Sequence, residues 1–114
     1  MKTKVNIGTD IIEVSRFRRK PIKKNRNFYN SIFTNLELIH CQKYSDTYPH
    51  LAGIFAAKEA VVKCIDLPLR ISDIEISWHE NGKPFVMIGH KKNTVQISIS
   101  HTKLLAIAVA VSLS

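Results

Sequence analysis

Two carboxylates and a lysine stand out in this chain because their surroundings are otherwise apolar. Glu59 and Lys63 interrupt a run of small and apolar residues from Ala52 to Cys64, and Asp10 follows a short apolar segment near the amino terminus. An exposed Glu-to-Lys pair at this spacing stabilises a helix by only about 0.3–0.5 kcal/mol, whereas burying an ion costs several kcal/mol. Helix stability is therefore a weak reason for these charges, and a surface helix with a flanking ion pair is the alternative interpretation.

Asp10 and Glu59 would form an oxygen site suited to Mg²⁺ if the fold brought them together. Mg²⁺ usually takes one or two carboxylates and completes its octahedron with water and substrate phosphate. Lys63 lies one helical turn after Glu59 and would face the same phosphate. Phosphoryl transfer needs such an arrangement, in which cations neutralise charge while a hydroxyl is positioned for attack. Taken alone, Asp10 is also typical of a turn or a helix N-cap.

His101 is a further candidate for phosphate binding because it stands at the end of an alternating segment. Val95, Ile97 and Ile99 alternate with polar residues there, which predicts a half-buried strand that ends near His101. The imidazole would bind a second phosphate or pack the hairpin, and on the residue alone packing is the stronger interpretation.

A helix around residues 51–65 must position Glu59 and Lys63. At about 100° per residue, one face is apolar and the opposite face carries Gly and Ala, so another element or a ligand can approach it closely. Glu59 and Lys63 stand on the flank between these faces, whereas Lys58 falls within the apolar stripe, and we expect its ammonium to reach an edge. The apolar face consists of Leu51, Ile54, Phe55, Val61, Val62 and Ile65.

The remaining pattern predicts strand, helices and then strands. A strand over residues 4–8 delivers Asp10 at its end, and a helix follows from Ile12 to about Lys20 before Pro21. Thr34-Asn-Leu-Glu37 is a capping box, so a helix should begin there and run to about Tyr44. Further strands are predicted over residues 71–78, 84–88, 95–100 and 104–111, with a tight turn at Asn81-Gly82 between the first two.

This order indicates an α+β fold, in which an antiparallel sheet packs on helices within a single domain over residues 1–114. The last strand alternates large residues such as Ile107 and Val109 with alanines, so neither face is polar and one face is expected to be covered by another subunit. A chain of 114 residues is also short for enclosing a deep active site by itself, and oligomerisation would solve that problem.

The net charge of +8 is concentrated in one segment. No Asp or Glu occurs from Val14 to Leu36, a field that favours an acidic partner: nucleic acid, an anionic membrane or an acidic protein. A solvated basic loop is the remaining interpretation. The basic side chains of this segment are Arg16, Arg18, Arg19, Lys20, Lys23, Lys24 and Arg26.

The chain has no segment that resembles a membrane span or a secretory signal. Its longest apolar stretch, Leu104 to Val111, is far shorter than the ~20 residues that a transmembrane helix requires. Cys41 and Cys64 lie far apart and without metal-ligand spacing, so we expect reduced, inert thiols. A cytoplasmic protein is predicted.

Six short blocks occur in an order that matches one family and cover nearly the whole chain. They are Ile7-Gly-Thr-Asp10-Ile-Ile-Glu-Val-x-Arg16, Phe33-Thr-x-x-Glu37, Phe55-Ala-Ala-Lys58-Glu59-Ala-x-x-Lys63, Asp73-Ile-Glu-Ile76, Asn81-Gly-Lys-Pro84 and Ser98-Ile-Ser-His101-Thr-Lys103. With these blocks the chain resembles holo-acyl-carrier-protein synthase, the small trimeric type of 4'-phosphopantetheinyl transferase.

The resemblance implies transfer of the phosphopantetheine arm of coenzyme A to a serine of an acidic carrier protein, with release of 3',5'-ADP. It implies that Asp10 and Glu59 hold Mg²⁺, that Lys63 meets the pyrophosphate, and that the active sites lie between the subunits of a homotrimer. It places coenzyme A also against His101, Gly82 and Pro84. The residues matched to carrier docking are Arg16, Arg19, Lys20, Lys23 and Arg26.

In the mechanism that this resemblance suggests, the carrier serine attacks the β-phosphate after losing its proton to Glu59 or to a magnesium-held water. One departure is the segment from Ile65 to Arg70, which is short and lacks the glycines usual in the family. Two alternatives stay open: a non-enzymatic basic domain that binds nucleic acid, which is the weaker interpretation, and a transferase-like protein that binds a carrier without turnover.

Overall fold

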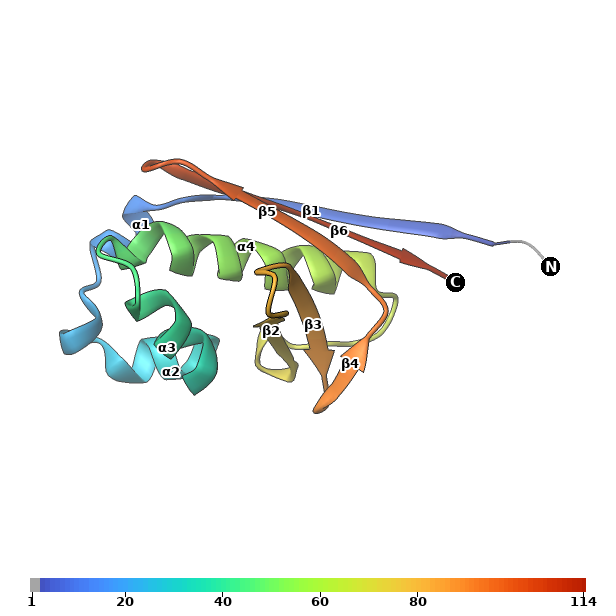
Figure 1. Ribbon diagram of the computed structural model, residues 1–114, viewed down its shortest axis with the longest axis horizontal. Coiled ribbons are helices and arrows are strands. Elements are labelled where there is room, and N and C mark those ends of the chain that lie inside the picture. Colours follow the sequence, from blue (N-terminus) through green and yellow to red (C-terminus); the bar gives the residue numbers. More distant parts are fainter. Residues whose placement is uncertain (1–2) are drawn as a thin grey trace.

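Helix α4 (Thr47–Cys64) is the element around which the rest of the fold is arranged (Figure 1). The computed structural model describes residues 3–114. One side of α4 packs against a sheet formed by β1 (Val5–Glu13), β6 (Leu105–Leu113) and β5 (Gln96–His101). Its other side contacts α3 (Asn35–Gln42) and β2 (Ile74–Trp78). Because α4 is covered from two sides, every residue from Leu51 to Lys58 is buried.

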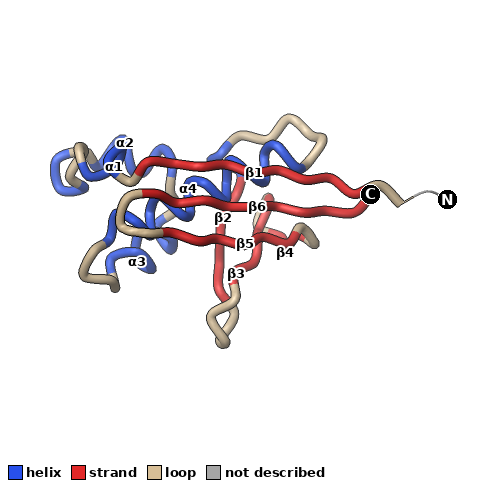
Figure 2. The backbone as a smooth tube through the Cα atoms, turned by 90° about the horizontal axis from the view of Figure 1, so that it is seen from above, coloured by secondary structure: helices blue, strands red, loops and turns tan. Residues whose placement is uncertain are grey.

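The first sheet is antiparallel, with β6 in the middle, and Figure 2 shows its three strands side by side above α4. β1 pairs with β6 along its whole length, from Val5 opposite Leu113 to Glu13 opposite Leu105. The alanines of β6 face the helix, and their small side chains allow the sheet and α4 to approach closely. These buried residues are Ala106, Ala108 and Ala110.

Gly8 marks the closest approach of β1 to α4. A side chain at this position would overlap the carbonyl oxygen of Ala60 and lie 2.9 Å from the backbone nitrogen of Cys64. The two backbones are therefore in direct contact. Residues of a strand alternate between its faces, so Asp10, two positions further on, is presented to the same side as Gly8.

The second sheet, β2, β3 (Pro84–Ile88) and β4 (Lys91–Asn93), is antiparallel in that order and lies beneath the carboxyl-terminal half of α4 (Figure 1). The 3₁₀ turn η2 (Ile71–Asp73) precedes it. The helices α1 (Ser15–Arg18), α2 (Arg26–Ile32) and α3, with the 3₁₀ turn η1 (Ile22–Lys24), gather toward the other end of the molecule. The predicted α+β class is thus confirmed, with two small sheets.

The predicted capping box is confirmed: Thr34 accepts a hydrogen bond from the Glu37 backbone, and the Glu37 side chain accepts one from the Thr34 backbone. The prediction for Lys58 is wrong. Its side chain is fully buried, its Nζ lies 2.6 Å from Glu37 Oε1, and it also donates to the carbonyl of Ile32. The Glu37 carboxylate and the Ile32 carbonyl accept the hydrogen bonds that water would accept from an exposed ammonium.

Three local predictions need correction. β1 continues to Glu13 because β6 pairs with it throughout, so Asp10 lies within the strand and not in a turn after it. The helix expected over residues 12–20 is reduced to the single turn α1. The strand expected over residues 71–78 begins at Ile74, after η2. Helix α2 and strand β4 were not predicted.

Both cysteines are free, as the sequence predicts, and the structure shows that both are also buried. Burial raises the pKa of the Cys41 thiol to about 12, so this group stays protonated at neutral pH. Within residues 3–114, we find no helix whose length and apolar content would allow it to cross a membrane.

Candidate active site

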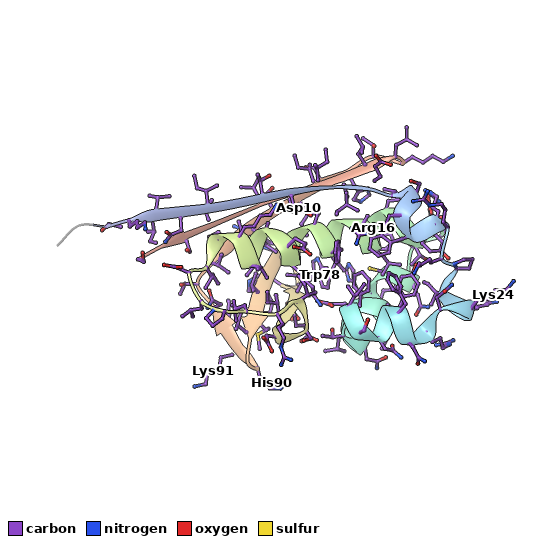
Figure 3. The ribbon with its side chains drawn as sticks, turned by 180° about the vertical axis from the view of Figure 1, so that it is seen from behind. Asp10, Arg16, Lys24, Trp78, His90 and Lys91 are labelled. Atoms are coloured by element: carbon purple, nitrogen blue, oxygen red, sulfur yellow. The ribbon has the colours of Figure 1, made fainter. Side chains whose placement is uncertain are left out.

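Asp10 and Lys63, which are 53 residues apart in the sequence, meet between β1 and α4. The Lys63 Nζ donates to Asp10 Oδ1 at 3.1 Å and to the carbonyl oxygen of Thr9 at 3.0 Å. Figure 3 shows Asp10 in the space between the strand and the helix. The Asp10 side chain is 16% exposed and that of Lys63 is 52% exposed, so the carboxylate lies inside and the ammonium at the mouth of the site.

The second carboxylate oxygen of Asp10, Oδ2, is buried and has no hydrogen-bond partner among the described residues. Buried polar atoms are nearly always paired, and an orphaned acceptor costs about 1–3 kcal/mol. An oxygen left in this state is therefore typical of a site that awaits a ligand with positive charge or a donor hydrogen.

Glu59 lies on α4 one turn before Lys63, which places the two side chains on the same side of the helix. It is half-buried and forms no ion pair with another described residue. The described residues hold no group of three or more His, Cys, Asp and Glu side chains that could hold a metal ion by themselves. Two carboxylates alone would suit only an ion such as Mg²⁺, whose other ligands are usually water and phosphate oxygens.

His101, Gly82 and Pro84 line a groove of about 400 Å³ together with residues of α3, α4, β2 and β5. Aromatic rings form much of its wall. His40 stacks on Trp78 with ring centroids 3.5 Å apart, and Tyr44 stacks on His50 at 3.6 Å. The His50 ring meets the edge of His101 at 4.6 Å. Stacked rings of this kind present flat surfaces, and imidazoles add hydrogen-bond donors.

Burial lowers the pKa of His50, and the nearby His101 and His40 lower it further. Burial also lowers the pKa of His40, with a smaller contribution from Lys43. Both imidazoles are therefore neutral at pH 7. No sequence pattern predicts that these rings lie together, because the groove joins residues from α3, α4, β2 and β5 that have no regular spacing in the chain.

The structure thus assembles the predicted residues in two places. Asp10 and Lys63 form one cluster, and Glu59 lies one helical turn from Lys63. His101, Gly82 and Pro84 belong to the groove, whose lining includes none of these three residues. The loop that follows α4 borders the first cluster, since Ile65 and Asp66 line a depression together with Lys63.

The basic residues predicted for carrier docking lie at the end of the molecule that carries α1, η1 and α2. Figure 3 shows Arg16 and Lys24 toward this end. α1 is attached to the start of α4 by Arg18, which pairs with Asp46 through two hydrogen bonds of 2.9 and 2.6 Å. The exposed basic side chains here are Arg16, Arg19, Lys20, Lys23, Lys24 and Arg26.

Comparisons with known proteins agree on one family. The family model of the 4'-phosphopantetheinyl transferase superfamily matches residues 6–111. The holo-[acyl-carrier-protein] synthase of Caldanaerobacter subterraneus subsp. tengcongensis is 38% identical, over 93% of this chain and 92% of its own length.

Two solved structures are similar throughout. The Helicobacter pylori holo-[acyl-carrier-protein] synthase in complex with coenzyme A is 30% identical, with a TM-score of 0.78 over 95% of this chain and 99% of its own. The Bacillus anthracis enzyme in complex with CoA (3',5'-ADP) is 32% identical, with a TM-score of 0.78 over 99% of each chain. The chain therefore belongs to the 4'-phosphopantetheinyl transferase superfamily.

Proposed function

We propose that this protein transfers the 4'-phosphopantetheine arm of coenzyme A to a serine hydroxyl of an acidic apo-acyl-carrier protein and releases 3',5'-ADP. The observation that carries the proposal is the Asp10–Lys63 pair with its unpartnered buried oxygen, in a chain whose relatives are named holo-[acyl-carrier-protein] synthase. Related structures in complex with coenzyme A support the choice of donor.

Asp10 and Glu59 would hold Mg²⁺, because Asp10 offers a free buried oxygen and Glu59 a carboxylate with no ion-pair partner among the described residues. When bound, Mg²⁺ supplies positive charge that neutralises the diphosphate. Lys63 would contact the same diphosphate through its exposed ammonium. Glu59 would accept the proton of the serine hydroxyl while the serine oxygen forms a bond to the β-phosphorus of coenzyme A. The bond between the β-phosphorus and the bridging oxygen of the diphosphate would then break, and the bridging oxygen would leave as part of 3',5'-ADP.

The nucleotide portion of coenzyme A would lie in the groove, against the rings beside His101 and the backbone at Gly82 and Pro84. The groove lining does not include Asp10, Glu59 or Lys63. In our proposal these two places meet across a subunit boundary, with the groove of one protomer next to the Asp10–Lys63 pair of its neighbour.

The outer face of β1 and β6 is apolar and would pack against another copy of this chain, in the homotrimer that the family resemblance implies. Contiguous apolar exposure of this kind is uncommon on monomers and marks an interface. Light scattering should therefore report the mass of three 13.0 kDa chains, whereas the mass of one chain would contradict the trimer. The exposed residues are Val5, Ile7, Ile11, Leu105, Ile107, Val109 and Leu113.

The basic end of the molecule would dock the acidic carrier. Its residues lie in a stretch without Asp or Glu, and the Arg18–Asp46 pair holds this end against α4. The same charges would attract nucleic acid, so nucleic-acid binding is the second candidate function. It gives no use to Asp10, Glu59 and Lys63 together.

The test is an intact-mass measurement on an acidic apo-carrier incubated with the full chain, Mg²⁺ and coenzyme A. The carrier should gain the mass of the arm. Glu59→Gln should lower turnover by about 10²–10⁴-fold, because a general base contributes that much. Lys91→Met is the matched control, since Lys91 is exposed on β4, and it should not change turnover.

Three outcomes would contradict parts of the proposal. Carrier binding without mass gain would indicate an inactive transferase-like protein. DNA binding with a steep salt dependence and no mass gain would favour the nucleic-acid binder. Normal turnover of Glu59→Gln at saturating Mg²⁺ would exclude the role assigned to that carboxylate.

A further inference from the structure

We propose that Lys63 serves as an internal cation for Asp10, which a divalent metal ion must displace or weaken in order to bind. A diphosphate that draws the ammonium away would then favour the metal, so Lys63 couples the binding of the two. This inference rests on the proposed function, because it assumes that Asp10 binds a metal ion.

The Lys63 ammonium binds Asp10 from the exposed side of the site. Lys63 Nζ uses two of its three donor hydrogens on Asp10 Oδ1 and the Thr9 carbonyl, at 3.1 and 3.0 Å. The side chain is about half exposed and comes from the last turn of α4. It can therefore turn outward into water or toward a phosphate without any movement of the helix.

The Asp10 carboxylate, in contrast, is held in place and is only partly hydrogen-bonded. Asp10 is mostly buried and sits in a strand paired on its whole length with β6, so it cannot follow the ammonium outward. Its Oδ2 has no partner among the described residues. Lys63 thus neutralises the charge of Asp10 through Oδ1 and leaves Oδ2 free for another ligand. A cation bound in this way can be replaced by a metal ion.

The Lys63 ammonium and a metal ion on Asp10 would repel each other. A divalent ion bound to Asp10 while Lys63 stays in place would put two cations on one largely buried carboxylate, where like charges repel strongly. No other acidic group forms an ion pair with Lys63 among the described residues. A diphosphate offers the ammonium new oxygens, and it removes the repulsion at the same time.

The experiment measures Mn²⁺ binding to the full chain without carrier, by the electron paramagnetic resonance signal of free Mn²⁺. Lys63→Met should bind Mn²⁺ about tenfold more tightly than the unmodified protein, an effect in the range of ordinary coupling between sites. Lys63→Gln, which keeps a neutral polar end, should shift the affinity in the same direction. Lys91→Met, which removes an exposed lysine on β4, should leave it unchanged.

Coenzyme A should then tighten Mn²⁺ binding by a larger factor in the unmodified protein than in Lys63→Met, because only the former has an ammonium to remove. Equal or weaker Mn²⁺ binding by both Lys63 variants, with their folds intact by circular dichroism, would overturn the inference and leave the metal site standing. Absence of Mn²⁺ binding to every protein, with coenzyme A present, would overturn the inference and also contradict the metal site of the proposed function.

Discussion

Two lysines of helix α4 pair with carboxylates of other elements, and the two pairs differ in how completely their polar atoms are hydrogen-bonded. Glu37 and Lys58 have fully buried side chains, and both carboxylate oxygens accept backbone hydrogen bonds, from Thr34 and Ile76, in addition to the lysine. Asp10 and Lys63 lie partly open, and one oxygen of Asp10 has no partner among the described residues.

The comparison separates a pair that builds the fold from a pair that is available for chemistry. Glu37 joins α3, β2 and α4 with every polar atom satisfied, so no ligand has anything to gain there. Asp10 keeps an unused oxygen beside an ammonium that water can reach. Free binding capacity, and not charge alone, distinguishes the candidate active site.

The largest expected effect on stability is at the closed pair. Lys58→Met leaves Glu37 as an unpaired buried carboxylate, which should lower the free energy of unfolding by about 3–5 kcal/mol. Lys63→Met removes a half-exposed partner and should cost about 1 kcal/mol or less. Urea unfolding of both variants measures the difference, and equal losses would remove the distinction between the two pairs.

A second prediction concerns the contact that holds the open pair together. Gly8→Ala forces a methyl group against the backbone of Ala60 and Cys64, and overpacking of this kind costs about 1–3 kcal/mol. Gly53→Ala is the matched control, because its methyl group would meet no backbone atom of another element but only the Cγ2 methyl group of the Ile99 side chain, at 2.9 Å. Urea unfolding should show the greater loss for Gly8→Ala, and the reverse order would contradict the close packing of β1 on α4.

The smallest effect is expected in the groove, where burial lowers the pKa of His40 and His50. Because the pKa of His50 is lowered from 6.5 by burial, protonation favours the unfolded chain. Its contribution to stability is therefore complete above pH 6.5 and is lost as the pH falls below that value. The unfolding free energy of His50→Phe should fall less steeply below pH 6.5 than that of the unmodified protein. Identical slopes would show that His50 does not contribute to the pH dependence of stability.

The sequence predicted the parts of the site that depend on local spacing. The capping box at Thr34 and Glu37, the apolar face of α4 and the alternation of β5 and β6 all follow from residues close together in the chain. The position of Lys63 relative to Glu59 follows in the same way from helix geometry.

What the sequence could not supply came from long-range pairing. The buried state of Lys58 depends on Glu37, and a lysine in an apolar stripe gives no local sign of a partner 21 residues away. β1 reaches Glu13 only because β6 pairs with it, and the aromatic groove exists only once α3, α4, β2 and β5 meet. The motif around Asp10 makes this residue a candidate, but its place within a strand follows only from the pairing of β1 with β6.

The most direct test of the division between the two pairs is the turnover number for arm transfer, measured on folded Asp10→Asn and folded Glu37→Gln in the intact-mass assay. We predict that Asp10→Asn loses on the order of 10²-fold in kcat or more with its urea midpoint nearly unchanged, because it removes one of the two carboxylates proposed to hold the Mg²⁺ that neutralises the diphosphate. Glu37→Gln should keep the kcat of the unmodified protein and lose stability instead. Full turnover of Asp10→Asn, or an equal loss of kcat in folded Glu37→Gln, would contradict the account.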